Sequence, residues 1–226
     1  MAELNKLDRE HLKKLIEEGS PVEMEFPVLN ASIQETIHFM VDAVLSKYSR
    51  PDLKECVYAS LKELVINGIK ANIKHVVFVE EKIDPNDETS LQHGLSIVKN
   101  LLHENDLVDL QHKAIQYNLK ITLSIIHSSE RLLLIIENNT MITELEEQRM
   151  REKFGAALKY DSIADYYMNN MDDSEGQGLG ITMIVLMLKG HNIDPHAFTL
   201  DLKNNNSTRA KIEFPMQCED IARNGG

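Results

Sequence analysis

The sequence Leu61-Lys-Glu-Leu-Val-Ile-Asn-Gly-Ile-Lys-Ala-Asn72 predicts a helix with two chemically different faces. Apolar residues recur at spacings of three and four, which places them as a stripe against a core: Leu61, Leu64, Val65, Gly68, Ile69 and Ala71. Polar residues recur at the same spacing on another face: Glu63, Asn67, Lys70 and Lys74. A carboxylate, an amide and two ammonium groups on one face can converge on a small anionic ligand. An ordinary amphipathic helix with a solvated polar face would show the same pattern, so a ligand site needs a second feature.

That second feature is the glycine-rich stretch Glu175-Gly-Gln-Gly-Leu-Gly-Ile181. Its three alternating glycines stand directly before an apolar helix, where free N–H groups and the positive end of the helix dipole favour a phosphate. The stretch differs from the dinucleotide fingerprint, because no strand precedes it and Leu179 stands between two glycines. It also differs from the phosphate-binding P-loop, because no Lys-Ser/Thr follows. A flexible hinge before a buried helix is the alternative interpretation.

The rest of the chain alternates helical and extended patterns, without an internal repeat or an interdomain linker. Helices are expected over 6–18, 32–47, 52–74, 90–103, 106–117 and 181–188, and the charged segment 143–170 is weakly helical. Strands are expected over 22–26 (at a sheet edge), 119–126, 131–136, 197–202 and 209–214. The run 76–79 fits either an extension of the preceding helix or a short strand. Because helices segregate from antiparallel hairpins, the pattern predicts an α+β fold with two layers.

Composition excludes several classes of function. The chain has 226 residues and a formal net charge of −12, which disfavours nonspecific nucleic-acid binding and docking on an anionic membrane surface. With no Trp and 5% aromatic residues, base-stacking platforms are not expected either. No apolar run approaches the ~18–20 residues that a membrane-spanning helix needs. Two cysteines, Cys56 and Cys218, are too few for a disulfide framework, so a cytoplasmic location is expected.

Four features occur in a recognisable order: Glu63-x-x-x-Asn67 on a helix, Glu137 at the end of a hairpin strand, the glycine-rich stretch, and Thr208 in a terminal strand. Together they resemble the ATPase superfamily of DNA gyrase, heat-shock chaperones, histidine kinases and mismatch-repair proteins, the Bergerat fold. The resemblance implies a mostly antiparallel sheet covered by helices on one face. It also implies an N-terminal extension at 1–31, an ATPase domain at 32–215 and a C-terminal tail at 216–226. Within the domain it implies a helical insertion at 80–117 and an ATP lid at 143–175.

The resemblance implies ATP and Mg²⁺ as cofactors and assigns roles to single residues. Asn67 would coordinate Mg²⁺, and Glu63 would orient or deprotonate the attacking water or hydroxyl. Lys70 would neutralise phosphate charge. Glu137 would accept a hydrogen bond from the adenine amino group, and the hydroxyl of Thr208 would support the adenine end. The segment wrapping the phosphates would contain Gly176, Gly178, Leu179 and Gly180.

One motif departs from the family. Its second motif reads Asp-x-Gly-x-Gly, whereas this chain has Glu137-Asn-Asn-Thr-Met141. Glu is one methylene longer than Asp, and Asn139 can replace a glycine in the left-handed conformation more cheaply than Met141 can. Asn139 is therefore included among the candidate nucleotide contacts. Either the pocket has a different shape and a weaker affinity, or nucleotide binding has been lost while the scaffold remains.

Three functions fit these observations. The first is a stand-alone Mg-ATP-binding domain in signalling that resembles the anti-sigma-factor serine kinases, which are cytoplasmic, usually dimeric and phosphorylate a partner protein; a split histidine-kinase ATP domain has the same features. The second is a pseudo-ATPase that serves as a protein-interaction module. The third, a DNA-directed ATPase of the gyrase type, is disfavoured by the acidic charge and the missing transducer domain. The expected partner is a protein, either a regulator or a phosphoacceptor, and a homodimer is compatible with the first reading.

Overall fold

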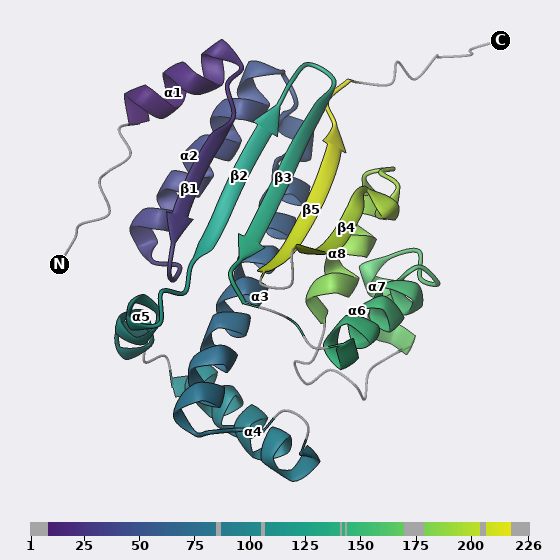
Figure 1. The fold of residues 1–226 in the computed structure, drawn as a ribbon. Coiled ribbons are helices and arrows are strands. Elements are labelled where there is room, and N and C mark those ends of the chain that lie inside the picture. Colours follow the sequence, from purple (N-terminus) through teal and green to yellow (C-terminus); the bar gives the residue numbers. More distant parts are fainter. Residues whose placement is uncertain are drawn as a thin grey trace.

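A five-stranded antiparallel sheet forms one layer of the molecule (Figure 1). The computed structural model describes residues 9–84, 87–104, 107–140, 142, 144–169, 179–203 and 207–217. The strands are β1 (Val22–Phe26), β2 (Ile121–His127), β3 (Arg131–Asn138), β4 (Phe198–Lys203) and β5 (Ser207–Pro215), in the spatial order β1-β2-β3-β5-β4. Each of the four pairings is antiparallel, and β1 is an edge strand, as predicted.

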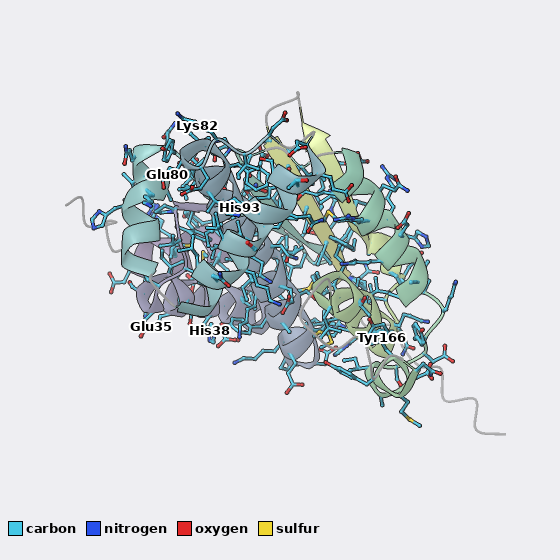
Figure 2. The ribbon with its side chains drawn as sticks, turned by 90° about the horizontal axis from the view of Figure 1, so that it is seen from below. Glu35, His38, Glu80, Lys82, His93 and Tyr166 are labelled. Carbon is cyan, nitrogen blue, oxygen red and sulfur yellow. The ribbon has the colours of Figure 1, made fainter. Side chains whose placement is uncertain are left out.

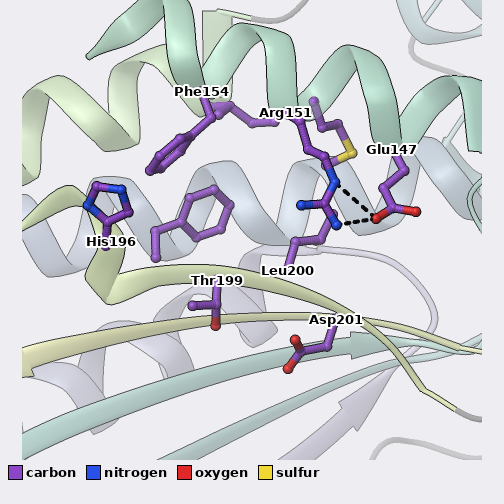
Figure 3. Close-up of a pocket in the computed structure, with 10 residues that line it drawn as sticks. Glu147, Arg151, Phe154, His196, Thr199, Leu200 and Asp201 are labelled. Atoms are coloured by element: carbon purple, nitrogen blue, oxygen red, sulfur yellow. Dashed lines mark hydrogen bonds and ion pairs between the residues drawn. The ribbon is translucent and has the colours of Figure 1, made fainter.

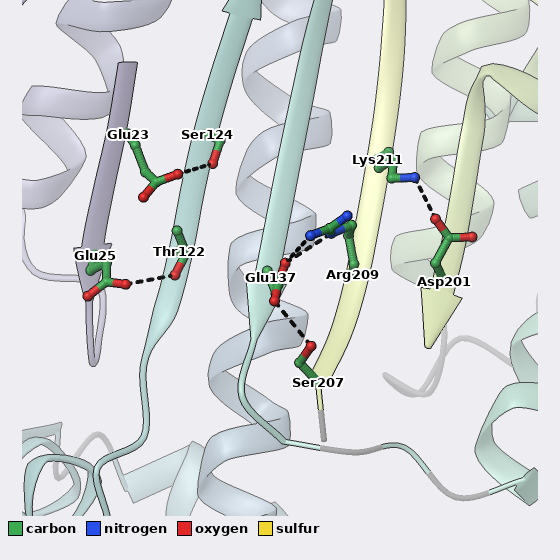
Figure 4. Close-up of polar contacts among 9 residues, drawn as sticks. All are labelled: Glu23, Glu25, Thr122, Ser124, Glu137, Asp201, Ser207, Arg209 and Lys211. Carbon is green, nitrogen blue, oxygen red and sulfur yellow. Dashed lines mark hydrogen bonds and ion pairs between the residues drawn. The ribbon is translucent and has the colours of Figure 1, made fainter. Parts of the chain in front are cut away.

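The strands have one buried face because their side chains alternate. In β2, Ile121, Leu123 and Ile125 are fully buried, whereas Thr122 and Ser124 between them are only partly covered. Polar contacts cross the other face, such as the hydrogen bond from Ser124 Oγ to Glu23 Oε2 of 2.8 Å (Figure 4). One face therefore faces the core, and the other is polar.

Helices form the second layer, behind the sheet in Figure 1. This layer contains α2 (Ala31–Lys47), α3 (Lys54–Glu80) and α8 (Leu179–Gly190), while α1 (Arg9–Glu18) packs against α2. Two further helices, α6 (Glu144–Ala157) and α7 (Ile163–Asn169), lie near the β4 edge, and short 3-10 turns, η1 (Pro51–Leu53) and η3 (Pro195–Ala197), precede α3 and β4. The predicted α+β architecture with an antiparallel sheet is confirmed.

Helix α3 is the central element of the helical layer. Its 27 residues begin after Pro51, and the ambiguous run 76–79 belongs to it. Gly68 lies against the sheet: a Cβ there would be 3.3 Å from Ile121 Cδ1. Neighbouring Leu64 and Val65 are buried, and each such side chain contributes about 1.5–3 kcal/mol to folding. Despite its length, neither α3 nor any other helix in the described ranges has an apolar stretch that could cross a membrane.

The predicted insertion folds onto the far end of α3. Its helices are α4 (Glu88–Glu104) and α5 (Leu107–Gln116). Val98 of α4 joins Ile73 and Val77 of α3 in a small apolar cluster separate from the main core. Lys113 Nζ of α5 bonds Glu80 Oε2 at 2.9 Å, at the end of α3 (Figure 2). Helices α4 and α5 thus pack on this end of α3.

A buried arginine fixes the joint between α2 and α3. Arg50 is 8% exposed and donates hydrogen bonds to the Asp52 carboxylate, at 2.7 Å from Nη2, and to Pro215 O, at 2.7 Å from Nη1. The hydrogen bond from Arg50 is the main reason that the pKa of Asp52 lies below its usual value. The joint is therefore tied to the end of β5.

His127 is the buried titratable group of the sheet. It is 5% exposed, and its Nδ1 shares a 2.9 Å hydrogen bond with the Tyr48 hydroxyl. Burial lowers the pKa of His127, and the nearby Lys47 ammonium lowers it further. The folded protein therefore disfavours the imidazolium form, which the unfolded chain adopts below its ordinary pKa of 6.5.

Acidification should consequently destabilise the protein through His127. As pH falls below about 6.5, the unfolded chain binds a proton that the native state resists, so the free energy of unfolding should fall. Urea unfolding near pH 7.5 and near pH 5 would measure this slope. His127→Gln should flatten the slope, whereas His93→Gln, an exposed residue labelled in Figure 2, should leave it unchanged. Equal slopes for all three proteins would contradict the assignment.

Candidate functional site

Two segments more than a hundred residues apart meet at the predicted site. At Gly180, a Cβ atom would lie 2.6 Å from Glu63 Oε2 and 3.5 Å from Asn67 Nδ2. The polar face of α3 is thus in contact with the backbone at the start of α8. Only a glycine permits this approach without moving the Glu63 carboxylate. Close packing alone therefore explains why residue 180 is a glycine, whether or not a ligand binds there.

The first turn of α8 faces this contact. The described part of α8 begins with Leu179 and Gly180, so this end of the helix lies beside Glu63 and Asn67. Such a helix start stabilises an anion, and the Glu63 carboxylate is itself favourably placed near it. Both Leu179 and Gly180 are partly accessible. The chemistry here suits a phosphate group next to an amide and a carboxylate.

The sheet contributes a buried polar cluster to the same side of the molecule. Asn138 of β3 lies opposite Thr208 of β5, and both are 6% exposed. Thr208 Oγ1 donates to Thr140 O at 2.9 Å, and Asn138 Nδ2 donates to Thr140 Oγ1. The Asn138 Cβ lies 3.9 Å from a Cβ built at Gly68, so the cluster adjoins α3. Thr208 therefore lies on the face of the sheet that α3 covers.

Glu137 does not lie on that face. Its carboxylate accepts hydrogen bonds from Arg209 Nε at 2.9 Å, Arg209 Nη2 at 2.7 Å and Ser207 Oγ at 3.1 Å (Figure 4). These groups lie on the polar face of the sheet, with Glu25 and Lys211. The structure thus corrects the expectation that Glu137 faces the ligand.

Asn139 also points elsewhere. Its Oδ1 accepts from Lys120 N at 2.8 Å, and its Nδ2 donates to Asn118 O at 2.7 Å, which ties the end of β3 to the start of β2. Its backbone does not take the left-handed conformation that a replaced glycine would suggest. Asn139 is thus a structural tie in this fold and not a neighbour of Glu63.

The physical reason for both corrections is strand parity. The sequence prediction ended the strand at residue 136, whereas β3 continues to Asn138. Since Ile136 is buried, alternation turns Glu137 outward and Asn138 inward. Extending the alternation of Leu132, Leu134 and Ile136 by one step would have found Asn138.

The two lysines on the polar face of α3 have different surroundings. Lys70 is exposed and makes no hydrogen bond or ion pair with other described residues. Lys74 is 14% exposed and forms an ion pair with Glu146 of α6. This pair ties the first part of the predicted lid to α3. The sequence analysis did not identify Glu146 as a functional residue, because only the fold places it beside Lys74.

Part of the predicted site lies outside the described residues. Gly176 and Gly178 are among these, as are residues 170–175 of the predicted lid. Within the described ranges, no three His, Cys, Asp or Glu side chains gather as a metal-binding group. Asn67 and Glu63 alone would hold Mg²⁺ only if phosphate and water oxygens completed its coordination, which is the usual arrangement for this ion.

A separate pocket of about 520 Å³ lies between α6 and β4 (Figure 3). Its lining includes Phe154, Phe198 and Ile181; the residues from α6 belong to the predicted lid, whereas Glu63, Asn67 and Gly180 do not line it. It is therefore distinct from the contact between α3 and α8.

Comparison with known proteins gives one relative and no function. No protein-family model matches the chain, and no solved structure matches it. The chain is similar to an uncharacterized protein of Treponema pallidum (strain Nichols), with 26% identity over 215 residues. The match covers 94% of this chain and 41% of the relative, so the chain spans about two fifths of that protein's length.

Proposed function

We propose that this chain binds ATP with Mg²⁺ in the manner of the Bergerat-fold ATPases and acts in signalling on a partner protein. The observation that carries this proposal is the contact of Gly180 with Glu63 and Asn67. A helix start, an amide and a carboxylate meet there, from segments more than a hundred residues apart in the sequence. This combination suits phosphate, Mg²⁺ and an attacking hydroxyl in one place.

The residues would divide the work as follows. The N–H groups at the start of α8 would bind phosphate oxygens, and Asn67 Oδ1 would contribute one ligand to Mg²⁺. Glu63, one helical turn before Asn67, would orient a water or a partner's hydroxyl and accept its proton. Asn138 and Thr208 would border the base. A protein kinase or an ATPase is the resulting activity, and the cytoplasm its proposed location.

A pseudo-ATPase that acts as a protein-interaction module is the second candidate. Asn138, Thr140 and Thr208 already bond one another, and none of the three is a carboxylate. The acid nearest in sequence, Glu137, is paired with Arg209 on the other face. The adenine base of a bound nucleotide would therefore meet the Asn138 amide, whose Nδ2 already donates a hydrogen bond to Thr140.

Titration with ATP distinguishes the two candidates. Isothermal titration of the full chain with ATP and Mg²⁺ should show binding, and Asn67→Ala should weaken the Mg²⁺-dependent affinity by about tenfold. Glu63→Ala should keep this binding but lower any kinase or ATPase turnover by roughly 10²–10⁴-fold. No heat of binding at millimolar nucleotide would leave the pseudo-ATPase as the better account. Unchanged turnover in Glu63→Ala would remove this residue from the mechanism.

Gly180→Ala tests the contact itself. The added methyl group would collide with the Glu63 carboxylate, so nucleotide affinity and turnover should both fall. Gly190→Ala, at the other end of α8, is the matched control, because a Cβ there meets nothing within 4 Å. That control should bind ATP normally and gain about 0.5–1 kcal/mol in stability, since Ala is the better helix former. Normal affinity and turnover in Gly180→Ala would place the site elsewhere.

Asn138→Asp tests the register assigned to the base end. A carboxylate would strengthen a hydrogen bond from an amino-bearing base by ~1 kcal/mol, so ATP affinity should rise by about fivefold. Some stability should be lost, because the donor to Thr140 disappears in a buried position. Glu137→Asp should leave affinity unchanged. Tighter binding by Glu137→Asp alone would reverse this assignment.

A further inference from the structure

The pocket between α6 and β4 has an apolar floor along a sheet edge (Figure 3). Met150 and Phe154 come from α6, Phe198 and Leu200 from β4, and Ile181 from α8. The rings of Phe154 and Phe198 have centroids 6.3 Å apart, which is within the range of a favourable aromatic contact. A volume of about 520 Å³ lies within the range of binding pockets.

One wall of this groove is an unpaired strand edge. β4 is the last strand of the sheet, and β5 is its one partner among the described strands. Alternate N–H and C=O groups of residues 198–201 therefore point away from β5, toward α6. The described part of the chain shows no backbone hydrogen bond from these residues to α6. The groove thus offers unused backbone donors and acceptors above an apolar floor.

The charged groups around the groove already have partners within the chain. On α6, Arg151 Nε donates a hydrogen bond to Glu147 Oε1 at 3.1 Å. On the sheet, Lys211 Nζ donates a hydrogen bond to Asp201 Oδ2 at 2.6 Å. Before β4, His196 Nδ1 lies 2.9 Å from Asp194 Oδ1. An ionic ligand would find no surplus counter-charge here, so the groove complements an uncharged occupant. A polypeptide backbone with apolar side chains meets both requirements.

We propose that an extended segment of a partner protein docks between β4 and α6 and adds a sixth strand to the sheet. Its backbone pairs with β4, and alternate apolar side chains enter the pocket. About four or five residues span residues 198–201, at roughly 3.3 Å per residue. A second copy of this chain fits less well, since its own α6 accompanies its β4 edge. The contacts that support this docking are separate from those of the proposed nucleotide site.

A displayed library of random heptapeptides, selected on the full chain, tests the proposal. Enriched sequences should carry apolar residues at alternate positions. Their affinity should fall by about tenfold or more in Leu200→Trp, because the larger side chain enters the groove from β4. Thr89→Trp, at an exposed threonine of α4, is the control and should bind as the wild type does.

Two further measurements can overturn the proposal. An enriched peptide that is N-methylated at alternate residues should lose binding, because it can no longer donate to β4; retained binding would mean that no strand is added. Sedimentation of the chain alone should show no self-association that Leu200→Trp abolishes. If such a dimer forms, the occupant is a second copy. Failure to enrich any peptide that binds the wild type more tightly than Leu200→Trp would also reject the site.

Discussion

The structure depends on how closely α3 can approach its two neighbours. Gly68 allows α3 to lie against Ile121 and Asn138 of the sheet, and Gly180 allows α8 to lie against Glu63 and Asn67. A Cβ at either glycine would lie closer to these neighbours than Cβ atoms usually do, so α3 packs tightly against both the sheet and α8. The main core, the polar cluster at Thr208 and the start of α8 are all positioned by these two approaches. Close packing and the candidate chemistry thus share the same residues, because the glycine that permits contact also exposes the backbone.

Much of this arrangement could be predicted from the sequence, since long elements carry strong periodicity. The two faces of α3, both hairpins and the apolar helix after the glycines follow from spacings of two, three and four residues. The meeting of Glu63, Asn67 and Gly180 came from family resemblance, because no local pattern relates segments this far apart. The wrong prediction was the end of strand β3, which continues for two residues beyond the predicted end and so turns Glu137 away from α3. A one-residue error at a strand end moves a side chain to the opposite face of the sheet.

Contacts between separate helices and strands could not be predicted from the sequence, for a different reason. The ion pair of Lys74 with Glu146 joins segments 72 residues apart, and nothing in either segment specifies the other. The groove at the β4 edge arises because α6 lies beside a strand from the other end of the chain. Met150 and Phe154 belong to a segment whose sequence indicates only a charged, weakly helical stretch. Only the tertiary arrangement leaves them facing an unpaired edge.

Helix α6 connects the two sites physically. Through Glu146 it is tied to Lys74, on the polar face of α3 that carries Asn67, and through Phe154 it forms a wall of the groove. A phosphate that attracts the Lys74 ammonium competes with Glu146 for the same charge, and so acts on the position of α6. Any effect of such a ligand on the affinity of the groove must be matched by an equal effect of the docked strand on that ligand, because binding free energies are reciprocal. Any coupling between the two proposed sites would therefore act through the Lys74–Glu146 pair.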